Sequence, residues 1–138
     1  MLEQQIGFLL RRAYHRNMGI WQSHGIDKQV TAVQISALVA LQNRGPCSLS
    51  DLGRSACMDP ATTRGVVERL EERGLMATWD DPGDRRRVIA GLTPAGEDVV
   101  ADMAESFEAI TEETLRPLSL VERVALTMLL QKIAYVEE

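Results

Sequence analysis

The chain has 138 residues, of which 45% are apolar and 25% charged, and it carries a net charge of −5, as an ordinary single globular domain does. No apolar run is long enough to span a membrane, and the first residues lack a secretion signal, so we expect a cytoplasmic protein without a membrane partner. Two cysteines, Cys47 and Cys57, are too few for a disulfide framework and have no histidines nearby to complete a zinc site.

The first part of the chain predicts two α-helices. Apolar residues at helical spacing indicate a helix over residues 2–23 that ends at Gly25. A second helix is predicted to start at Thr31, because Thr31 and Gln34 have the spacing of a capping box. The sequence Asn-Arg-Gly-Pro at 43–46 ends this helix.

The middle of the chain predicts two further helices with a short turn between them. A short helix starts at Ser48 and ends near Cys57. Asp59 and Pro60 then open a helix over residues 60–73, because aspartate caps free backbone N–H groups and proline fits the first helical turn. Two helices joined in this way are typical of a helix-turn-helix.

A β-hairpin is predicted directly after these helices. Two short extended segments, 75–79 and 85–92, flank a Pro-Gly turn at 80–84, and apolar residues alternate along the second segment. A hairpin in this place is the wing of a winged helix.

Two helices are predicted after the hairpin. A long one starts at the Thr-Pro pair at 93–94 and is broken by Pro117. The last starts at the capping box of Ser119 and Glu122 and runs to about residue 136. Its apolar residues cover more than one face, which one small domain cannot bury alone, so we expect a homodimer.

These elements predict a mostly α fold with a small β-hairpin wing, of the α+β class. We expect a single domain over residues 1–138, in which residues 31–93 form a winged helix-turn-helix. Residues 1–30 and 94–138 would supply N- and C-terminal dimerisation helices.

The net charge is distributed unevenly along the chain, and this bears on DNA as a partner. Residues 1–53 have a balance of +2, residues 54–87 of 0 and residues 88–138 of −7. Exposed charges farther apart than about 10 Å are largely screened at ~0.1 M salt, so local basic groups decide phosphate contact. The negative total therefore does not exclude DNA binding. The order of a helix-turn-helix followed by a wing predicts that the helix at 60–73 enters the major groove of double-stranded operator DNA and that the wing at 80–87 reaches the minor groove.

Two short motifs carry a resemblance to a known family. They are Asp-Pro-Gly-Asp-Arg-Arg-Arg at 81–87 and Leu-Thr-Pro-Ala-Gly at 92–96. In that order and spacing, the segment that contains them, residues 48–97, resembles the MarR family of bacterial winged-helix regulators. The resemblance implies a sequence-specific DNA-binding transcription regulator, most often a repressor.

The resemblance also implies which residues lie at the DNA. Arg86 would reach the minor groove with Asp84 orienting it, and Arg64 would contact guanine. Many members of the family carry Thr then Arg where this chain has Arg64 then Gly65. The predicted DNA-contacting residues are Ser48, Ala61, Thr62, Thr63, Arg64, Asp84, Arg85, Arg86 and Arg87. The alternative is that the arginines form only a solvated hairpin tip and the threonines an ordinary first turn of helix.

The first helix carries cationic and aromatic side chains that fit an anionic aromatic effector. MarR-family regulators commonly release DNA when a small aromatic or anionic molecule binds near their dimerisation helices. His15, Arg16 and Trp21 are the candidates for binding an aromatic acid or its thioester. The alternative is a solvated helix face with Trp21 packed at its end.

The sequence offers little support for other chemistry. It has no glycine-rich phosphate loop, metal-ligand spacing or nucleophile elbow, so we expect neither an enzyme nor a cofactor. Cys57, in the turn of the helix-turn-helix, could sense oxidants as a reactive thiolate, although a passive turn residue is favoured. A winged-helix protein–protein interaction module is the remaining alternative, but such a module has little need for three arginines in its wing.

Overall fold

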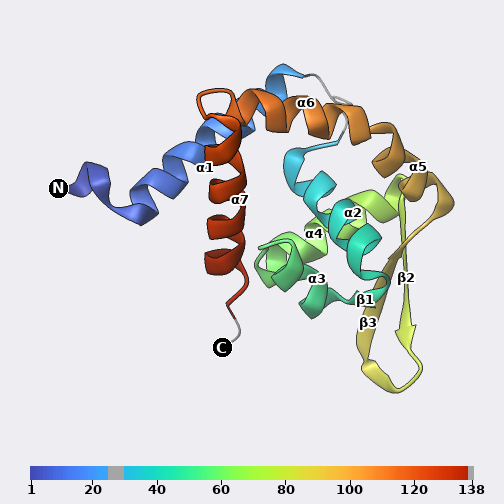
Figure 1. Ribbon diagram of the computed structural model, residues 1–138. Helices are drawn as coiled ribbons and strands as arrows, with labels where there is room; N and C mark the ends of the chain where they lie inside the picture. The colour runs from blue at the N-terminus through green and yellow to red at the C-terminus, as the bar shows by residue number, and fades with distance from the viewer. Residues whose placement is uncertain (25–29, 137–138) are drawn as a thin grey trace. The chain divides into compact units, whose positions relative to one another are not determined.

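The computed structural model describes residues 1–24 and 30–136, which fall into two compact units (Figure 1). The smaller unit contains residues 1–24 and 106–138, and the larger contains residues 25–105. The predicted mostly α fold with a small antiparallel sheet is confirmed. Within the described residues, no helix has both the length and the apolar character needed to cross a bilayer. Gly25, the predicted end of the first helix, lies outside the described residues.

The larger unit is a winged helix. Its elements are α2 (Ala32–Arg44), β1 (Cys47–Ser48), α3 (Leu49–Ser55), α4 (Pro60–Glu72), β2 (Met76–Asp81), β3 (Asp84–Leu92) and α5 (Pro94–Asp102). The strands form an antiparallel sheet in the order β1-β3-β2, in which Trp79 lies opposite Ile89 and Cys47 opposite Ala90. The β2–β3 hairpin extends beyond α2, α3 and α4 as the wing (Figure 1).

Four fully buried side chains hold the larger unit together. Leu38 of α2, Leu52 of α3, Leu70 of α4 and Met76 of β2 come from different elements and meet in one core. Burying a side chain of this size stabilises a fold by about 1.5–3 kcal/mol relative to leaving it in water. This core therefore fixes α3 and α4 relative to the wing.

The smaller unit consists of helices. They are the short 3-10 helix η1 (Leu2–Gln4), α1 (Ile6–Ser23), most of α6 (Ala104–Leu115) and α7 (Leu120–Ala134). Arg16 on α1 donates hydrogen bonds to the carbonyl oxygens of Thr114, at 2.7 Å, and Glu113, at 3.1 Å. The rings of Trp21 and Phe107 lie 5.4 Å apart at an angle of 60°. These contacts attach α1 to α6.

Two helices start at the capping boxes that the sequence predicts. At α2, Thr31 Oγ1 accepts the N–H of Gln34 at 3.2 Å, and Gln34 Oε1 accepts the N–H of Thr31 at 3.2 Å. At α7, Ser119 and Glu122 exchange the same pair of bonds at 3.2 and 2.9 Å. Each box satisfies two backbone donors that have no partner inside the helix.

The long helix predicted from residue 94 to Pro117 is wrong, because the chain forms two helices there, α5 and α6. The break lies at Met103, whose N–H donates to the carbonyl oxygen of Val100, three residues back, at 3.2 Å. A bond of this kind tightens the last turn of a helix and ends it. The Met103 side chain is 5% exposed, so packing favours the break. Helix α5 belongs to the larger unit, which extends to residue 105.

Two details of the sheet also differ from the prediction. The strand β1 was not predicted, because its two residues precede α3 without an alternating pattern. The hairpin turn is tighter than the predicted 80–84, because β2 continues to Asp81 and β3 starts at Asp84. The wing arginines that follow Asp84 lie on β3 beside the turn, as the predicted segment 85–92 has them.

Candidate nucleic-acid interface

Helix α4 is the predicted recognition helix, and its sequence separates a buried face from an exposed face. Its buried residues are Thr63, Val66, Val67 and Leu70. At its start, Asp59 Oδ1 accepts the N–H of Thr62 at 2.7 Å, and this backbone hydrogen bond lowers the pKa of the Asp59 carboxyl. The exposed face presents Ala61, Thr62 and Arg64. The cap stabilises the first turn of α4, and with it the positions of these three side chains on the surface.

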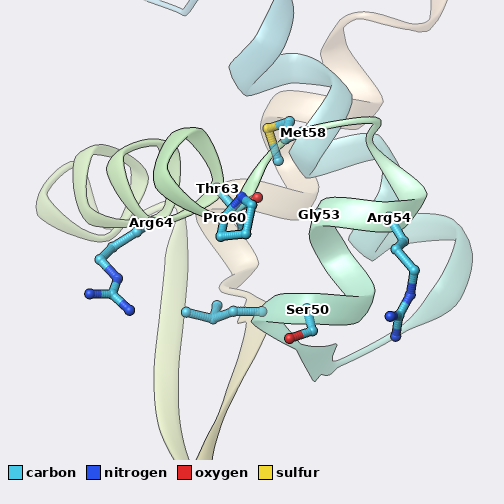
Figure 2. Close-up of a pocket in the computed structure, with 8 residues that line it drawn as sticks. Ser50, Gly53, Arg54, Met58, Pro60, Thr63 and Arg64 are labelled. Carbon is cyan, nitrogen blue, oxygen red and sulfur yellow. The ribbon is translucent and has the colours of Figure 1, made fainter.

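The packing of α3 on α4 depends on Gly53. A side-chain carbon at Gly53 would lie 2.7 Å from Thr63 Oγ1 and 3.0 Å from the carbonyl oxygen of Met58. The Thr63 hydroxyl also donates to the carbonyl oxygen of Asp59 at 2.8 Å. Only glycine allows the two helices of the helix-turn-helix to approach this closely. Figure 2 shows the residues at this junction that it labels: Ser50, Gly53, Arg54, Met58, Pro60, Thr63 and Arg64.

The wing places its arginines beside a two-residue turn. Asp81 Oδ1 accepts the N–H of Gly83 at 2.9 Å, and Asp84 Oδ1 accepts the N–H of Arg86 at 3.0 Å. The Nε atom of Arg86 lies 3.6 Å from the same Asp84 oxygen, and the Arg86 side chain is 94% exposed. Asp84 therefore contacts both the backbone N–H and the guanidinium Nε of Arg86, while the Arg86 side chain remains exposed to solvent.

A groove with a volume of about 540 Å³ lies between α3, α4 and the wing. The residues that line it are Ser48, Leu49, Ser50, Asp51, Arg54, Arg64, Arg86, Arg87 and Val88. Four of these are arginines and only Asp51 is acidic, so the groove is locally positive although the whole chain is negative. A positive groove beside an exposed helix face suits the phosphate backbone of DNA.

The structure places the predicted DNA-contacting residues at two depths. The side chains of Ser48 and Thr63 are only 5% and 2% exposed. The Ser48 hydroxyl accepts the N–H of Asp51 at 3.2 Å and caps α3, so it is engaged within the fold. The two hydroxyl groups therefore make hydrogen bonds within the fold, while Ser48 also lines the groove at the start of α3. The exposed members of the set are Ala61, Thr62, Arg64, Arg85, Arg86 and Arg87.

Comparison with known proteins gives the family of the chain. A sequence model of the MarR family matches residues 30–88 of this chain. The HTH-type transcriptional repressor NicR of Pseudomonas putida is 42% identical over 129 residues, which cover 94% of this chain and 82% of NicR. The chain belongs to the MarR family. The predicted family and the predicted function, a DNA-binding transcription regulator, are thereby confirmed.

Solved structures of MarR-family proteins have the same fold. BpsR of Bordetella bronchiseptica superimposes with a TM-score of 0.87 at 45% identity, covering 96% of this chain and all of BpsR (100%). That structure concerns the regulation of BpsR DNA binding by 6-hydroxynicotinic acid. PcaV of Streptomyces coelicolor, in complex with its natural ligand, has a TM-score of 0.84 at 27% identity and covers 97% of this chain and 94% of PcaV.

Sequence reasoning missed one group of charged residues at the interface of this MarR-family chain. The Nη2 atom of Arg54 lies 2.5 Å from Asp51 Oδ1, and that of Arg44 lies 3.4 Å from Asp51 Oδ2. The hydrogen bond from Arg54 is the main cause that lowers the pKa of the Asp51 carboxyl. The three-residue spacing of Asp51 and Arg54 on one helix was a signal in the sequence. The approach of Arg44 from α2 depends on the tertiary fold.

The three predicted effector residues of this MarR-family chain lie on α1. Arg16 is engaged with the last carbonyl groups of α6, and Trp21 with Phe107 of the same helix, so the structure brings these two residues to α6. His15 is exposed. Near them, His24 Nε2 and Glu113 Oε2 lie 2.8 Å apart. An arginine that caps helix carbonyls has fewer donors left for a ligand.

The two cysteines have different surroundings. Cys47 on β1 is 7% exposed, and burial raises the pKa of its thiol. Cys57 is exposed in the turn between α3 and α4, where its φ of 56° is left-handed. In that turn, the N–H of Met58 donates to the carbonyl oxygen of Gly53 at 2.8 Å. Among the described residues, no three His, Cys, Asp or Glu side chains lie together as a metal site would require.

Proposed function

We propose that this MarR-family regulator is a cytoplasmic, homodimeric repressor that binds operator DNA through α4 and the β2–β3 wing. The observation that carries the proposal is the groove in which arginines of α3, α4 and β3 meet beside the exposed face of α4. An interface between two protein surfaces has little use for four guanidinium groups around one groove, whereas each can neutralise a phosphate.

Each exposed residue of the interface has a proposed role. Arg64, on the exposed face of α4, reads a guanine in the major groove, and Ala61 and Thr62 lie beside it against the bases. Arg86 enters the minor groove, oriented by Asp84, because a narrow minor groove attracts guanidinium groups. The remaining wing arginines contact phosphates.

The second copy in the dimer is proposed to cover α7 and part of α1. No residue of α7 is buried within the described chain, although the helix is rich in large apolar side chains. The exposed apolar residues of α7 include Leu120, Val121, Val124, Met128, Leu129 and Ile133. An apolar surface of this extent is unfavourable in water, and a partner surface removes it from solvent. A twofold dimer would also place two α4 helices about 34 Å apart, the distance between successive major grooves.

The effector is proposed to be a small aromatic carboxylate. This part of the proposal is supported by BpsR, whose DNA binding is regulated by 6-hydroxynicotinic acid. On α1, Arg16 offers a cationic group, His15 an imidazole and Trp21 a ring face. Such a ligand lowers DNA affinity only to the extent that it prefers the conformation that does not bind DNA.

Two measurements on the purified full chain test the proposed function. Sedimentation gives the oligomeric state, and fluorescence anisotropy gives the affinity for fragments of the promoter region of its own gene. We expect a dimer and sequence-specific binding that hydroxylated aromatic acids reverse. A monomer, or a dimer that ignores every fragment at low salt, would reject DNA repression and favour the protein–protein module.

The location of the effector is tested separately. His15→Ala and Trp21→Ala are expected to weaken release by the aromatic acid without changing DNA affinity in its absence. Arg16→Ala is expected to weaken release as well, and it also removes two hydrogen bonds to α6, so its thermal stability is measured alongside. Release that survives all three substitutions would move the effector site elsewhere.

A further inference from the structure

The carboxylate of Asp51 on α3 lies among three guanidinium groups from three different elements. Arg54 of α3 approaches it at 2.5 Å, Arg44 of α2 at 3.4 Å and Arg87 of β3 at 3.9 Å. The Asp51 side chain is 24% exposed, whereas those of the three arginines are 48–75% exposed. The carboxylate is therefore the inner member of this cluster, and the arginines surround it on the solvent side.

Arg87 connects the wing to α3 through this cluster. Its Nη2 atom lies 3.9 Å from Asp51 Oδ2, and its Nε atom lies 3.9 Å from Asp81 Oδ2 at the end of β2. Its neighbour Arg86 has Asp84 as its acidic contact and is 94% exposed. The two adjacent arginines of β3 thus differ, because Arg87 faces acidic groups of both the wing and α3.

An acidic residue in this position needs an explanation. Asp51 lines the same groove as Arg54, Arg64, Arg86 and Arg87, where a negative charge repels phosphates. The three arginines are 48–75% exposed, and ion pairs with partners as exposed as these contribute little to the stability of a fold. The ion pairs alone therefore do not account for the acidic residue. Its geometry can instead restrict how the flexible arginine side chains are arranged before DNA arrives, which reduces the entropy lost on binding.

We propose that Asp51 is a positioning residue for DNA binding, which holds Arg54 and Arg87 in the groove so that both guanidinium groups meet the phosphate backbone. This inference rests on the proposed function, since it concerns the same groove. It adds that α3 and the base of the wing act as one surface, with Arg87 as the link between them.

The substitution Asp51→Asn separates this role from simple electrostatics. Removing a negative charge near phosphates raises DNA affinity if Asp51 has no other function. If it positions two arginines, the affinity falls by about tenfold, and the slope of log affinity against log salt becomes smaller by about 1. The backbone part of the helix cap is kept, because the Ser48 hydroxyl accepts the backbone N–H of Asp51. The Ser48 side chain also has a hydrogen bond with the Asp51 carboxylate, so the melting temperature of the variant is measured as well.

Asp80→Asn is the matched control. Asp80 is an exposed residue of β2, and no arginine lies within ion-pair distance of it among the described residues. We expect this variant to bind DNA as well as the wild type or more tightly. Asp51→Glu keeps the charge and is expected to restore a large part of the lost affinity.

A double-mutant cycle completes the test. Arg54→Gln and Arg87→Gln should each weaken DNA binding in the wild type and should have little further effect in the Asp51→Asn background. The inference is overturned if Asp51→Asn raises affinity as Asp80→Asn does, or if the losses in the cycle are independent. If the wild type itself binds no promoter fragment, the proposed function fails instead. If Asp51→Asn lowers the melting temperature, Asp51→Glu and Arg87→Gln provide the test: wild-type affinity and salt slope for Arg87→Gln would overturn the inference, because Arg87 would then not be a link that meets the phosphates.

Discussion

Gly96 on α5 lies against the carbonyl group of Leu75, so that a side-chain carbon at Gly96 would stand 2.1 Å from the Leu75 oxygen. The same oxygen accepts the N–H of Thr93 at 3.2 Å, and the Thr93 hydroxyl donates to the carbonyl oxygen of Gly74 at 2.6 Å. Thr93 Oγ1 also accepts the N–H of Gly96 at 3.1 Å, which caps α5. The Leu-Thr-x-x-Gly run therefore fastens α5 to the chain that enters β2.

Gly96→Ala is expected to destabilise the fold by about 3 kcal/mol, because the added methyl group clashes with backbone atoms that cannot move independently. Urea unfolding followed by circular dichroism measures the change. Gly65→Ala is the matched control, since a side-chain carbon there meets no atom within 4 Å. Alanine inside a helix is favoured over glycine by up to about 1 kcal/mol, so this control should stabilise α4. Equal stability of the two variants would contradict the prediction.

The cap at Asp59 predicts how stability changes with pH. The N–H of Thr62 holds the pKa of Asp59 below its ordinary value of 3.8. A carboxyl with a depressed pKa stabilises the fold above its unfolded value, and this contribution is lost as the pH falls through the folded value. We expect Asp59→Asn to show a smaller loss of stability between pH 5 and acid than the wild type, in denaturant titrations from about pH 6 to 2. Identical pH profiles for both proteins would contradict the prediction, because the charge of the Asp59 carboxylate would then contribute nothing to stability.

Arg64→Ala is expected to change which DNA sequence the protein prefers. A guanidinium group that bonds to one guanine discriminates that base by about 1–3 kcal/mol. Selection of binding sites from a random DNA pool should lose the preference at one position of each half-site. Thr62→Ala, two residues before Arg64 on α4, provides a comparison in the same helix. If Arg64→Ala binds all sequences more weakly but keeps the same sequence preference, the prediction is contradicted, and Arg64 would instead be a phosphate contact.

Met128→Glu is expected to weaken the dimer. Met128 on α7 is 56% exposed in the single chain, and the proposed interface would bury the new carboxylate without a partner. The dimer dissociation constant in sedimentation experiments should rise by at least about 100-fold. Gln131→Glu adds the same charge at a polar position of α7 and should have a smaller effect. A dimer unaffected by Met128→Glu would place the interface elsewhere.

Local sequence signals predicted most helix starts correctly. Thr31 with Gln34 and Ser119 with Glu122 mark α2 and α7, and Asp59 marks α4, because capping depends on residues three positions apart in the chain. These capping patterns are local in the chain, so the sequence alone predicts them without knowledge of the tertiary fold.

Features that depend on distant contacts were not predictable in the same way. The break at Met103 has neither glycine nor proline to announce it, and the side chain is buried by packing. The burial of Thr63 against Gly53, and the approach of Arg87 to Asp51 across 36 positions of sequence, arise only when α3, α4 and β3 come together. The predicted list of DNA-contacting residues therefore includes one buried threonine, and it does not include Arg54, which lines the groove.

The salt dependence of DNA binding by Arg86→Ala is the decisive measurement for a wing that contacts DNA, because the Arg86 side chain is 94% exposed and its acidic contact, Asp84, is part of the wing itself. Anisotropy titrations on one promoter fragment at several salt concentrations compare it with the wild type and with Arg116→Ala, an exposed arginine of the smaller unit. We predict weaker binding to every sequence and a salt slope smaller by about 1 for Arg86→Ala alone. Affinity and slope equal to those of the wild type would contradict a wing that contacts DNA.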